Sequence, residues 1–583
     1  MKRYLLTVIC AVLLANTCFS QAPRKSGAGA APASSNESSD ASAWWKHAVI
    51  YEIYPRSFGD TKGNGFGDLN GITKHLDYLH DLGVDAIWIS PAYPSPQVDF
   101  GYDISDYVNI APEYGTLADF DHLMAEARKR DIRVIMDLVL NHTSDKHKWF
   151  LESKSSRTSP KRDWYMWHDG KGADGRQPPN NWQSVFAHSA WQWDPRTKQF
   201  YYHMFYKEQP DLNWSNPLVR KAMYDVARFW MDRGVAGFRL DAITTLFEDS
   251  SLHDDPVKTG TNEFGDPNID HKYTDNLPEV HDVLRELRAV INEYPGRVLI
   301  GETYLPNVQE LAKMYGARND ELHLPMDTQM GFINKLSVPE FRQKIKDAET
   351  QLKGNMPLFV FDNHDNRRSW DRYGDGHNND QIARVIAALL LAPRDTALLF
   401  QGQELGMQNT DAKRREDVKD PIGRTGWPKE KGRDGERTPM QWNAGRNAGF
   451  SNGSSTWLPV APNYKQVNVA AEETDPNSIL NFYKSLIRLR RENTALRDGD
   501  FVMLNESDNN VLSFLRRTGD GKAVVVALNF TPSPQKISFD LKSQGVATTG
   551  TQALLSSFAK TGETGDISNL SLPAYGVYIA EVR

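Results

Sequence analysis

Three carboxylates follow short apolar runs of the sequence and have the chemistry of a shared catalytic site. They are Asp241 in GFRLDA, Glu302 in VLIGET and Asp365 in FDNHD. Cleavage of a glycosidic bond needs two carboxyl groups, because one protonates the leaving oxygen while the other attacks the anomeric carbon or activates water. By spacing alone, the three residues could equally form structural salt bridges. The choice depends on the elements that hold them.

The elements are predicted by eight apolar runs with helical patterns between most of them. The runs cover residues 49–54, 84–90, 134–140, 237–240, 298–301, 322–324, 358–361 and 397–400. Buried strands that alternate with helices predict an α/β fold with a closed (β/α)8 TIM barrel. Polar residues come directly after the runs, where such barrels hold their active sites. Strand ends of one barrel can bring two carboxyl groups within the ~5–5.5 Å that a retaining mechanism requires.

Two segments depart from this alternation and divide the chain further. Residues 143–208 are irregular and rich in Trp, Asn, Pro and Gly, and they are too long for a plain loop. We expect a subdomain there, inserted after the third strand between barrel segments 44–142 and 209–497. Residues 498–583 contain short strands with turns, which predicts a C-terminal antiparallel β-sandwich domain.

The composition narrows the classes of function. The chain has 583 residues, of which 39% are hydrophobic and 25% charged, as in ordinary folded proteins. The net charge of −7 argues against a nucleic-acid partner, which usually binds a basic surface. No run after the first residues approaches the ~20 apolar residues of a membrane span.

The amino terminus has the pattern of a secretory signal. Residues 1–20 begin with basic residues, continue with a short apolar run and end with small residues before an expected cleavage site. Residues 21–43 are rich in Ala, Ser, Gly and Pro, as in flexible linkers. Cys10 and Cys18 both lie in the signal, so the mature protein would contain no disulfide. We expect export to a bacterial periplasm or to the medium.

Four motifs resemble, in order and spacing, those of the α-amylase superfamily, glycoside hydrolase family 13. They are DLVLNH (137–142), GFRLD (237–241), GET (301–303) and FDNHD (361–365). QPDLN (209–213) and RTPMQW (437–442) are typical of its oligo-1,6-glucosidase and α-glucosidase, or maltase, branch. The resemblance extends over about residues 44–583. It implies an enzyme that cleaves small α-glucosides and needs no cofactor for catalysis.

The resemblance also implies a role for each carboxylate. Asp241 is similar to the family's nucleophile, and Arg239 would hydrogen-bond it and keep it ionised. Glu302 is similar to the general acid and base, which requires a raised pKa. Asp365 matches the residue that stabilises the transition state.

Further positions match residues that surround the bound glucose in this branch. His142 and His364 resemble two histidines that donate to glucose hydroxyls, Asp99 and Arg437 resemble the pair that closes the pocket, and Tyr102, Phe186 and Phe205 match aromatic positions of its wall. A pocket closed beyond one sugar implies release of glucose from the non-reducing end.

Residue Ala242, directly after Asp241, bears on linkage preference. Members specific for α-1,6 bonds tend to have Val there, whereas those that prefer α-1,4 bonds have a smaller or polar residue. The small methyl group of alanine leaves more room on the acceptor side. We expect an α-1,4 preference on maltose-like or sucrose-like substrates, with an α-1,6-preferring enzyme as the alternative.

Residues 60–68, DTKGNGFGD, resemble the calcium loop of this branch. The matching oxygen ligands would come from Asp60, Asn64, the Phe66 carbonyl and Asp68. Lys62 stands where the family has Asn or Asp, and an ammonium group repels a cation. Either calcium binds weakly as a structural ion, or Lys62 neutralises the loop in its place.

Two other functions fit the same barrel less well. A glucosyltransferase or isomerase, such as a trehalose synthase or sucrose isomerase, would have the same three carboxylates. The arginines of NRRSWDR (366–372) resemble the loop of sucrose isomerases. A non-enzymatic binding protein would have lost the carboxylates and gained a membrane span. The sequence does not indicate the oligomeric state.

Overall fold

Eight parallel strands close into a barrel, which confirms the predicted α/β class. The computed structural model describes residues 43–546, 548 and 550–583, so the predicted signal and the linker up to residue 42 lie outside it. Around the barrel the strand order is β1-β13-β12-β11-β10-β7-β3-β2. The strands are β1 (Val49–Ile53), β2 (Ala86–Ile89), β3 (Arg133–Val139), β7 (Gly237–Asp241), β10 (Val298–Gly301), β11 (Leu324–Asp327), β12 (Leu358–Phe359) and β13 (Thr396–Phe400). Each of the eight apolar runs overlaps one strand, although β11 shares only Leu324 with its run because the strand extends beyond it to Asp327.

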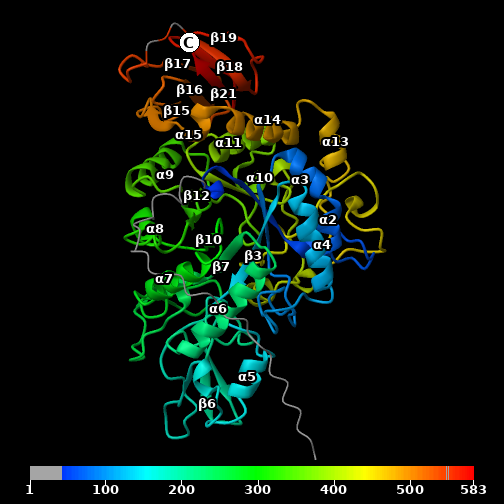
Figure 1. Ribbon diagram of the computed structural model, residues 1–583, viewed down its shortest axis with the longest axis vertical. Helices are drawn as coiled ribbons and strands as arrows, with labels where there is room; N and C mark the ends of the chain where they lie inside the picture. Colours follow the sequence, from blue (N-terminus) through cyan, green and yellow to red (C-terminus); the bar gives the residue numbers. More distant parts are fainter. Residues whose placement is uncertain (1–42, 547, 549) are drawn as a thin grey trace, which may run out of the picture. The chain divides into compact units, whose positions relative to one another are not determined.

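Amphipathic helices cover the barrel from outside (Figure 1). The main ones are α4 (Leu117–Arg128), α6 (Pro217–Asp232), α7 (Val280–Ile291), α9 (Val338–Gln351), α11 (Asn379–Leu391) and α14 (Ile479–Glu492). Thr116 and Asp119 form a capping box that starts α4, while Asn216 caps α6 ahead of Pro217. In α6, Val219, Met223, Ala227 and Trp230 recur at helical spacing and are buried.

The contact between β7 and β10 brings two of the predicted catalytic residues together. Gly237 begins β7 with φ +150°, and a Cβ there would lie 2.0 Å from the Val298 carbonyl oxygen. Glycine therefore permits the close approach of the two strands. Leu240 pairs with Gly301, and Glu302 N donates to Leu240 O over 2.9 Å. Asp241 and Glu302 consequently leave the barrel side by side.

An inserted subdomain follows β3. It contains α5 (Lys148–Ser153) and a three-stranded antiparallel sheet of β4 (Trp167–His168), β6 (Gln199–Tyr202) and β5 (Trp191–Asp194). Trp182, Trp191, Phe200 and Tyr202 form its small core. These elements lie within the segment 143–208 that was singled out as a subdomain.

A second insertion was not predicted. Strands β8 (Val257–Thr261) and β9 (Pro267–Ile269) form a hairpin after β7. Every residue of β8 is exposed, so no apolar alternation could indicate it. The hairpin region contacts the subdomain, because Asp266 pairs with His188 at 3.0 Å and the Trp182 indole donates to His253 O.

The carboxyl-terminal residues form the expected antiparallel domain. One sheet has the order β14-β15-β16-β21-β18-β19, and β17 pairs with β20 in a second. The strands are β14 (Asp500–Leu504), β15 (Val511–Arg517), β16 (Ala523–Asn529), β17 (Gln535–Ile537), β18 (Thr551–Ser556), β19 (Thr564–Gly565), β20 (Leu570–Leu572) and β21 (Val577–Val582). Buried Arg516 donates to Ala392 O, just after α11, which joins this domain to the barrel. Within the described residues, no helix combines the length and apolar character needed to cross a bilayer.

Hydrogen bonds from its own backbone stabilise the loop 60–68, which resembles a calcium site. The Asp60 carboxylate accepts from the N–H groups of Lys62, Gly63 and Gly65 over 2.7–2.9 Å and from the Ser451 hydroxyl over 2.6 Å. Asp68 accepts from Gly71 N at the start of α2 (Leu69–Lys74). The Asn64 side chain accepts from Phe66 N. The predicted ligand oxygens of the side chains therefore already have donors.

Lys62 points to a neighbouring turn. Its ammonium group donates to the carbonyls of Pro112 and Glu113 over 3.1 and 2.9 Å. Across the residues that the structure describes, no group of three or more His, Cys, Asp or Glu side chains is arranged to hold a metal ion. The loop with Lys62 does not fit a calcium ion, which takes six to eight oxygen ligands. We propose that the Lys62 ammonium group connects the loop to the turn at Pro112 and Glu113, and that this contact takes the place of a bound calcium ion.

This proposal predicts a melting temperature that does not respond to calcium. Unfolding followed by circular dichroism should give the same midpoint in excess CaCl2 and in EDTA, because an ion that does not bind adds no stability. Lys62→Asn restores an oxygen ligand and should create a calcium-dependent rise of the midpoint. A calcium-dependent rise in the wild-type protein would contradict the proposal.

Candidate active site

The predicted carboxylates meet around one buried arginine. Arg239 and Asp241 lie two residues apart on the same face of β7. One guanidinium nitrogen of Arg239, Nη1, lies 2.6 Å from Asp241 and 3.1 Å from Asp137 on β3, and Nη2 forms an ion pair with Glu302. Asp137 and Arg239 occupy paired positions of adjacent strands. A single cation therefore holds three carboxylates from three neighbouring strands.

Burial raises the pKa values of two of these carboxyl groups, Glu302 and Asp241. Burial raises the pKa of Glu302 to about 7, and the charges of Asp241 and Asp365 add to the effect against Arg239. Burial likewise raises the pKa of Asp241 to about 7, opposed by Arg239. Both carboxyl groups contact the Arg239 guanidinium, so the ionisation of each group depends on the same cation. Ala242 N also donates to Glu302 over 2.9 Å, which fixes the orientation of that carboxyl group.

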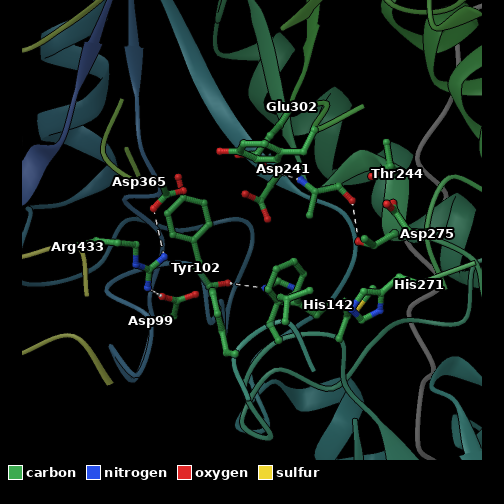
Figure 2. A pocket seen from close by; sticks show the side chains of 17 residues that line it. Asp99, Tyr102, His142, Asp241, Thr244, His271, Asp275, Glu302, Asp365 and Arg433 are labelled. Atoms are coloured by element: carbon green, nitrogen blue, oxygen red, sulfur yellow. Dashed lines mark hydrogen bonds and ion pairs between the residues drawn. The ribbon is translucent and has the colours of Figure 1, made fainter. Parts of the chain in front are cut away.

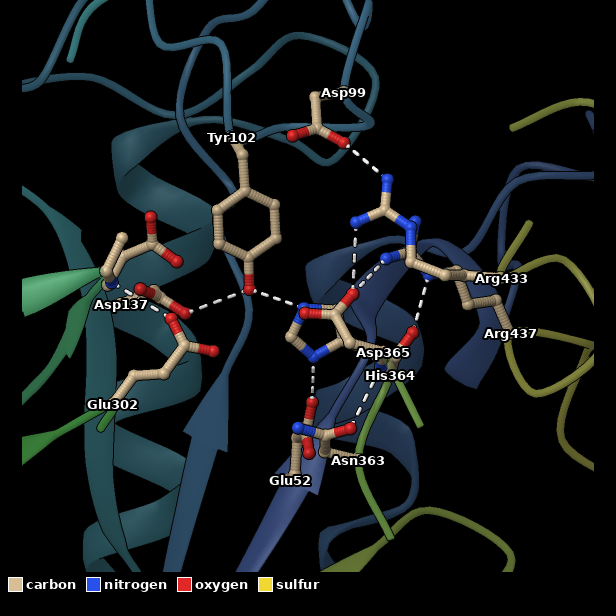
Figure 3. A network of polar contacts seen from close by, with 12 residues as sticks. Glu52, Asp99, Tyr102, Asp137, Glu302, Asn363, His364, Asp365, Arg433 and Arg437 are labelled. Atoms are coloured by element: carbon tan, nitrogen blue, oxygen red, sulfur yellow. Dashed lines mark hydrogen bonds and ion pairs between the residues drawn. The ribbon is translucent and has the colours of Figure 1, made fainter. Parts of the chain in front are cut away.

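Asp365 lies in the opposite electrostatic environment. Burial opposes its ionisation, but the charges of Arg433 and Arg437 outweigh burial and hold its pKa well below the usual range. Arg437 contacts one Asp365 oxygen at 2.5 Å, and Arg433 contacts it at 3.2 Å. Asp365 is therefore a permanent anion (Figure 3).

A chain of buried hydrogen bonds supports the floor of the site. The Tyr102 hydroxyl lies 2.7 Å from His364 Nε2 and donates to Asp137 over 3.2 Å. On its other side, His364 Nδ1 lies 2.5 Å from Glu52 on β1. Burial lowers the pKa of His364 well below its usual value, so the ring is neutral. Glu52 was missed in the sequence, where a lone Glu inside the apolar run VIYEI was the only signal.

The arginine beside Asp99 is Arg433 rather than the expected Arg437. Arg433 donates to Asp99 over 2.8 Å and to Asp420 over 2.7 Å. Arg437 is fully buried and contacts Asp365 together with the His364 carbonyl. Both arginines lie in GRDGERTPMQW, four residues apart. This stretch of the sequence indicated that an arginine would meet Asp99, but only the fold shows which of the two does so.

His142 and two phenylalanines line the wall next to Asp99. Gln209 donates to Asp99 over 3.1 Å and lies 3.0 Å from His142 Nε2. Burial lowers the pKa of His142 to about 3, so this imidazole is neutral. The rings of Phe205 and His142 are 5.1 Å apart, and the Arg433 guanidinium lies over Phe186 at 5.1 Å. Neutral polar groups and aromatic faces together suit a sugar ring.

These side chains surround one cavity of about 410 Å³, a size typical of small-ligand sites (Figure 2). Eight of the predicted residues line it: Asp99, Tyr102, His142, Phe186, Phe205, Asp241, Glu302 and Asp365. Arg239, His364 and Arg437 lie behind them and hold them through the contacts above. Residues that the sequence analysis did not assign also line the cavity, namely Val185, Met204, Thr244, Thr245, His271, Asp275, Tyr304 and Arg433.

Comparison with known proteins places this geometry in a family. The chain is 43% identical over 489 residues to a probable α-glucosidase of Rhizobium meliloti (strain 1021), covering 82% of this chain and 88% of that protein. It is 39% identical over 519 residues to an oligo-1,6-glucosidase of Parageobacillus thermoglucosidasius, covering 84% and 90%. The crystal structure of the trehalulose synthase of Pseudomonas mesoacidophila MX-45 is similar with a TM-score of 0.83 at 34% identity, covering 93% of this chain and 99% of that one.

The family assignment follows from the extent of these matches. Residues 52–499 match the alpha-amylase catalytic domain, and residues 501–579 match the maltogenic amylase C-terminal domain. The first match contains all eight barrel strands except the start of β1, together with every residue that lines the cavity. The chain belongs to the α-amylase family, glycoside hydrolase family 13, among relatives named α-glucosidase and oligo-1,6-glucosidase.

Proposed function

We propose that this chain is a retaining, exo-acting α-glucosidase that releases glucose from the non-reducing end of small α-glucosides. The proposal rests chiefly on one observation: Asp241 and Glu302 share the Arg239 guanidinium at one cavity. An ionised carboxylate and a protonated carboxyl group at that place match the two roles of double displacement.

In the first step, Asp241 attacks the anomeric carbon while Glu302 donates its proton to the departing glycosidic oxygen. The bond to the leaving sugar breaks and a glucosyl ester of Asp241 forms. In the second step, Glu302 takes a proton from water, the water oxygen attacks the anomeric carbon, and Asp241 departs as a carboxylate. Two inversions leave the released glucose in the α configuration.

The closed end of the cavity supports exo-action. Asp99 and Arg433 are ion-paired there, and Gln209 donates to Asp99 from the adjacent wall. A terminal glucose presents hydroxyls to these charged groups, whereas a longer chain could continue past them only by separating the Asp99–Arg433 ion pair. The anion Asp365 lies between this end and the reacting carboxyl groups, where it can stabilise positive charge on the sugar ring.

The linkage preference and the cellular location are parts of the proposal that rest on sequence patterns. Ala242 borders the cavity beside Asp241, and its small side chain favours α-1,4-linked substrates such as maltose, or sucrose. Export to the periplasm or the medium rests on the signal-like residues 1–20.

Transfer or isomerisation is the second candidate, favoured by the similarity to a trehalulose synthase. The arginine-rich loop does not strengthen it, because its arginines contact other protein groups. Arg367 pairs with Asp411, Arg368 donates to the carbonyls of Gln401 and Glu436, and Arg372 donates to the Phe361 carbonyl. None of the three lines the cavity.

The proposed function predicts the first product. Purified mature protein incubated separately with maltose, isomaltose, sucrose and trehalose should release α-glucose within the first minutes, as followed by NMR. Asp241→Asn should abolish turnover of every substrate, because an amide cannot form the glucosyl ester, and its circular dichroism should match the wild type. A new disaccharide at constant total sugar would instead assign the chain to the isomerases. Asp241→Asn turnover within tenfold of wild type would remove Asp241 as the nucleophile.

The rate should have a bell-shaped dependence on pH, because Asp241 and Glu302 must be in opposite protonation states. Asp241 must be ionised and Glu302 protonated, and burial raises both pKa values to about 7. The value of kcat/KM on maltose should therefore fall on either side of neutral pH, with the alkaline fall caused by deprotonation of Glu302. On α-glucosyl fluoride the alkaline fall should weaken, because fluoride departs without a proton. Equal alkaline falls on both substrates would remove Glu302 as the general acid.

The residue after the nucleophile should control linkage preference. Ala242→Val narrows the cavity next to Asp241, so the ratio of kcat/KM on isomaltose to that on maltose should rise. Initial rates of glucose release at several substrate concentrations provide this ratio. An unchanged ratio would show that residue 242 does not determine linkage.

A further inference from the structure

Glu52 is a buried acid that the proposed reaction has not used. It lies on β1 and is inaccessible to solvent. Its Oε1 atom lies 2.5 Å from His364 Nδ1, while Oε2 has no hydrogen-bond partner among the described residues (Figure 3). An ionised carboxylate that is buried with so few donors is costly, whereas a neutral carboxyl group can itself donate. The surroundings therefore favour a proton on Glu52.

The neighbouring charges do not reverse this preference. Burial raises the pKa of Glu52 well above its usual value; the charge of Arg239 opposes the rise, and the charges of Asp365 and Asp137 add to it. Arg239 already forms ion pairs with three other carboxylates. Its single positive charge is thus shared among groups that lie closer to it in the network than Glu52 does.

A proton on Glu52 gives the buried chain of hydrogen bonds one direction. Glu52 donates to His364 Nδ1, which leaves Nε2 as the nitrogen that carries hydrogen in the neutral ring. This Nε2–H group donates to the Tyr102 oxygen over 2.7 Å, and the Tyr102 hydroxyl donates to Asp137 over 3.2 Å. The same N–H group faces the Asp365 carboxylate at 3.4 Å. Each contact then joins a donor to an acceptor.

An ionised Glu52 would disrupt this chain. It would draw the ring hydrogen of His364 to Nδ1, so the lone pair on Nε2 would face the Asp365 carboxylate, which is repulsive. The single hydrogen of the Tyr102 hydroxyl would also have two competing acceptors, His364 Nε2 and Asp137. The contacts on the Nε2 side of the ring therefore agree with a neutral Glu52.

We propose that Glu52 is a positioning residue that stays neutral, sets the tautomer of His364 and thereby holds Tyr102 and Asp365 in place for the reaction. Tyr102 and Asp365 line the cavity, and Glu52 acts on them through the His364 ring. This inference rests on the proposed function, because the groups that Glu52 holds are those of the proposed active site.

Two substitutions of Glu52 separate its proton from its shape. Glu52→Gln keeps the shape and a donor, so kcat/KM on maltose should stay within about threefold of wild type. Neither limb of its pH profile should move, because no charge is removed. Glu52→Leu has a similar size but no donor. It should lower kcat/KM by roughly 10- to 100-fold, because Tyr102 and Asp365 lose their support.

Glu404→Leu is the matched control. Glu404 is also inaccessible to solvent and accepts from Tyr51, the neighbour of Glu52 on β1, and from Tyr78. These contacts lie outside the chain that runs through His364. Glu404→Leu should lower the melting temperature, because two buried hydroxyls lose their acceptor, but should leave kcat/KM of the folded protein at the wild-type level.

NMR of protein labelled with 15N-histidine reads the tautomer without turnover. The ring signals of His364, assigned by their loss in His364→Gln, should show hydrogen on Nε2 and none on Nδ1. Hydrogen on Nδ1 would contradict the proposal. A shift of both pH limbs of Glu52→Gln to lower pH would also do so, because it would show that an anion had been removed.

The kinetics can overturn the positioning role separately. Wild-type turnover in Glu52→Leu would show that Glu52 does not position the site, and equal losses in Glu52→Gln and Glu52→Leu would show that a donor at this place is not sufficient. If the wild-type protein releases glucose from no α-glucoside, the proposed function fails, and the NMR signals of His364 still decide whether Glu52 is neutral.

Discussion

The site depends on one buried cation, the guanidinium of Arg239. It is inaccessible to solvent and contacts Asp137, Asp241 and Glu302, which come from β3, β7 and the end of β10. Without it, three carboxylates would face one another in a low-dielectric interior and would take up protons. Removing one partner of a buried ion pair typically costs about 3–5 kcal/mol. The strand register that places Asp137 beside Arg239 therefore influences the ionisation of Asp241 and Glu302.

Arginines also separate the roles of the carboxylates. Asp241 and Glu302 share one guanidinium, and burial raises the pKa of both to about 7. Asp365 faces two further arginines, and its pKa is lowered instead. Groups of the same chemical type can therefore act as a proton carrier and as a permanent anion within one cavity. The difference comes from Arg433 and Arg437, which follow the last barrel strand in the sequence.

The barrel and its insertions contribute different parts of the site. Strand ends supply the carboxyl groups that we propose to react, because neighbouring strands hold them in fixed register. Loops and insertions supply the walls: Asp99 and Tyr102 follow β2, Phe186 and Phe205 belong to the subdomain, and Asp275 follows the β8–β9 hairpin. This division explains how one barrel can serve relatives named as glucosidases and as a trehalulose synthase.

The sequence by itself determined the barrel, the antiparallel C-terminal domain and the positions of Asp241, Glu302 and Asp365. The reason is that this information is local: each buried strand overlaps an apolar run, and the three carboxylates stand in short motifs at or after the ends of such runs. Only the tertiary structure decided that Arg433 rather than Arg437 meets Asp99, that Glu52 supports His364, and that Asp275 faces the cavity. Those contacts join segments from about thirty to more than three hundred residues apart, and no local pattern records which loops the closed barrel brings together.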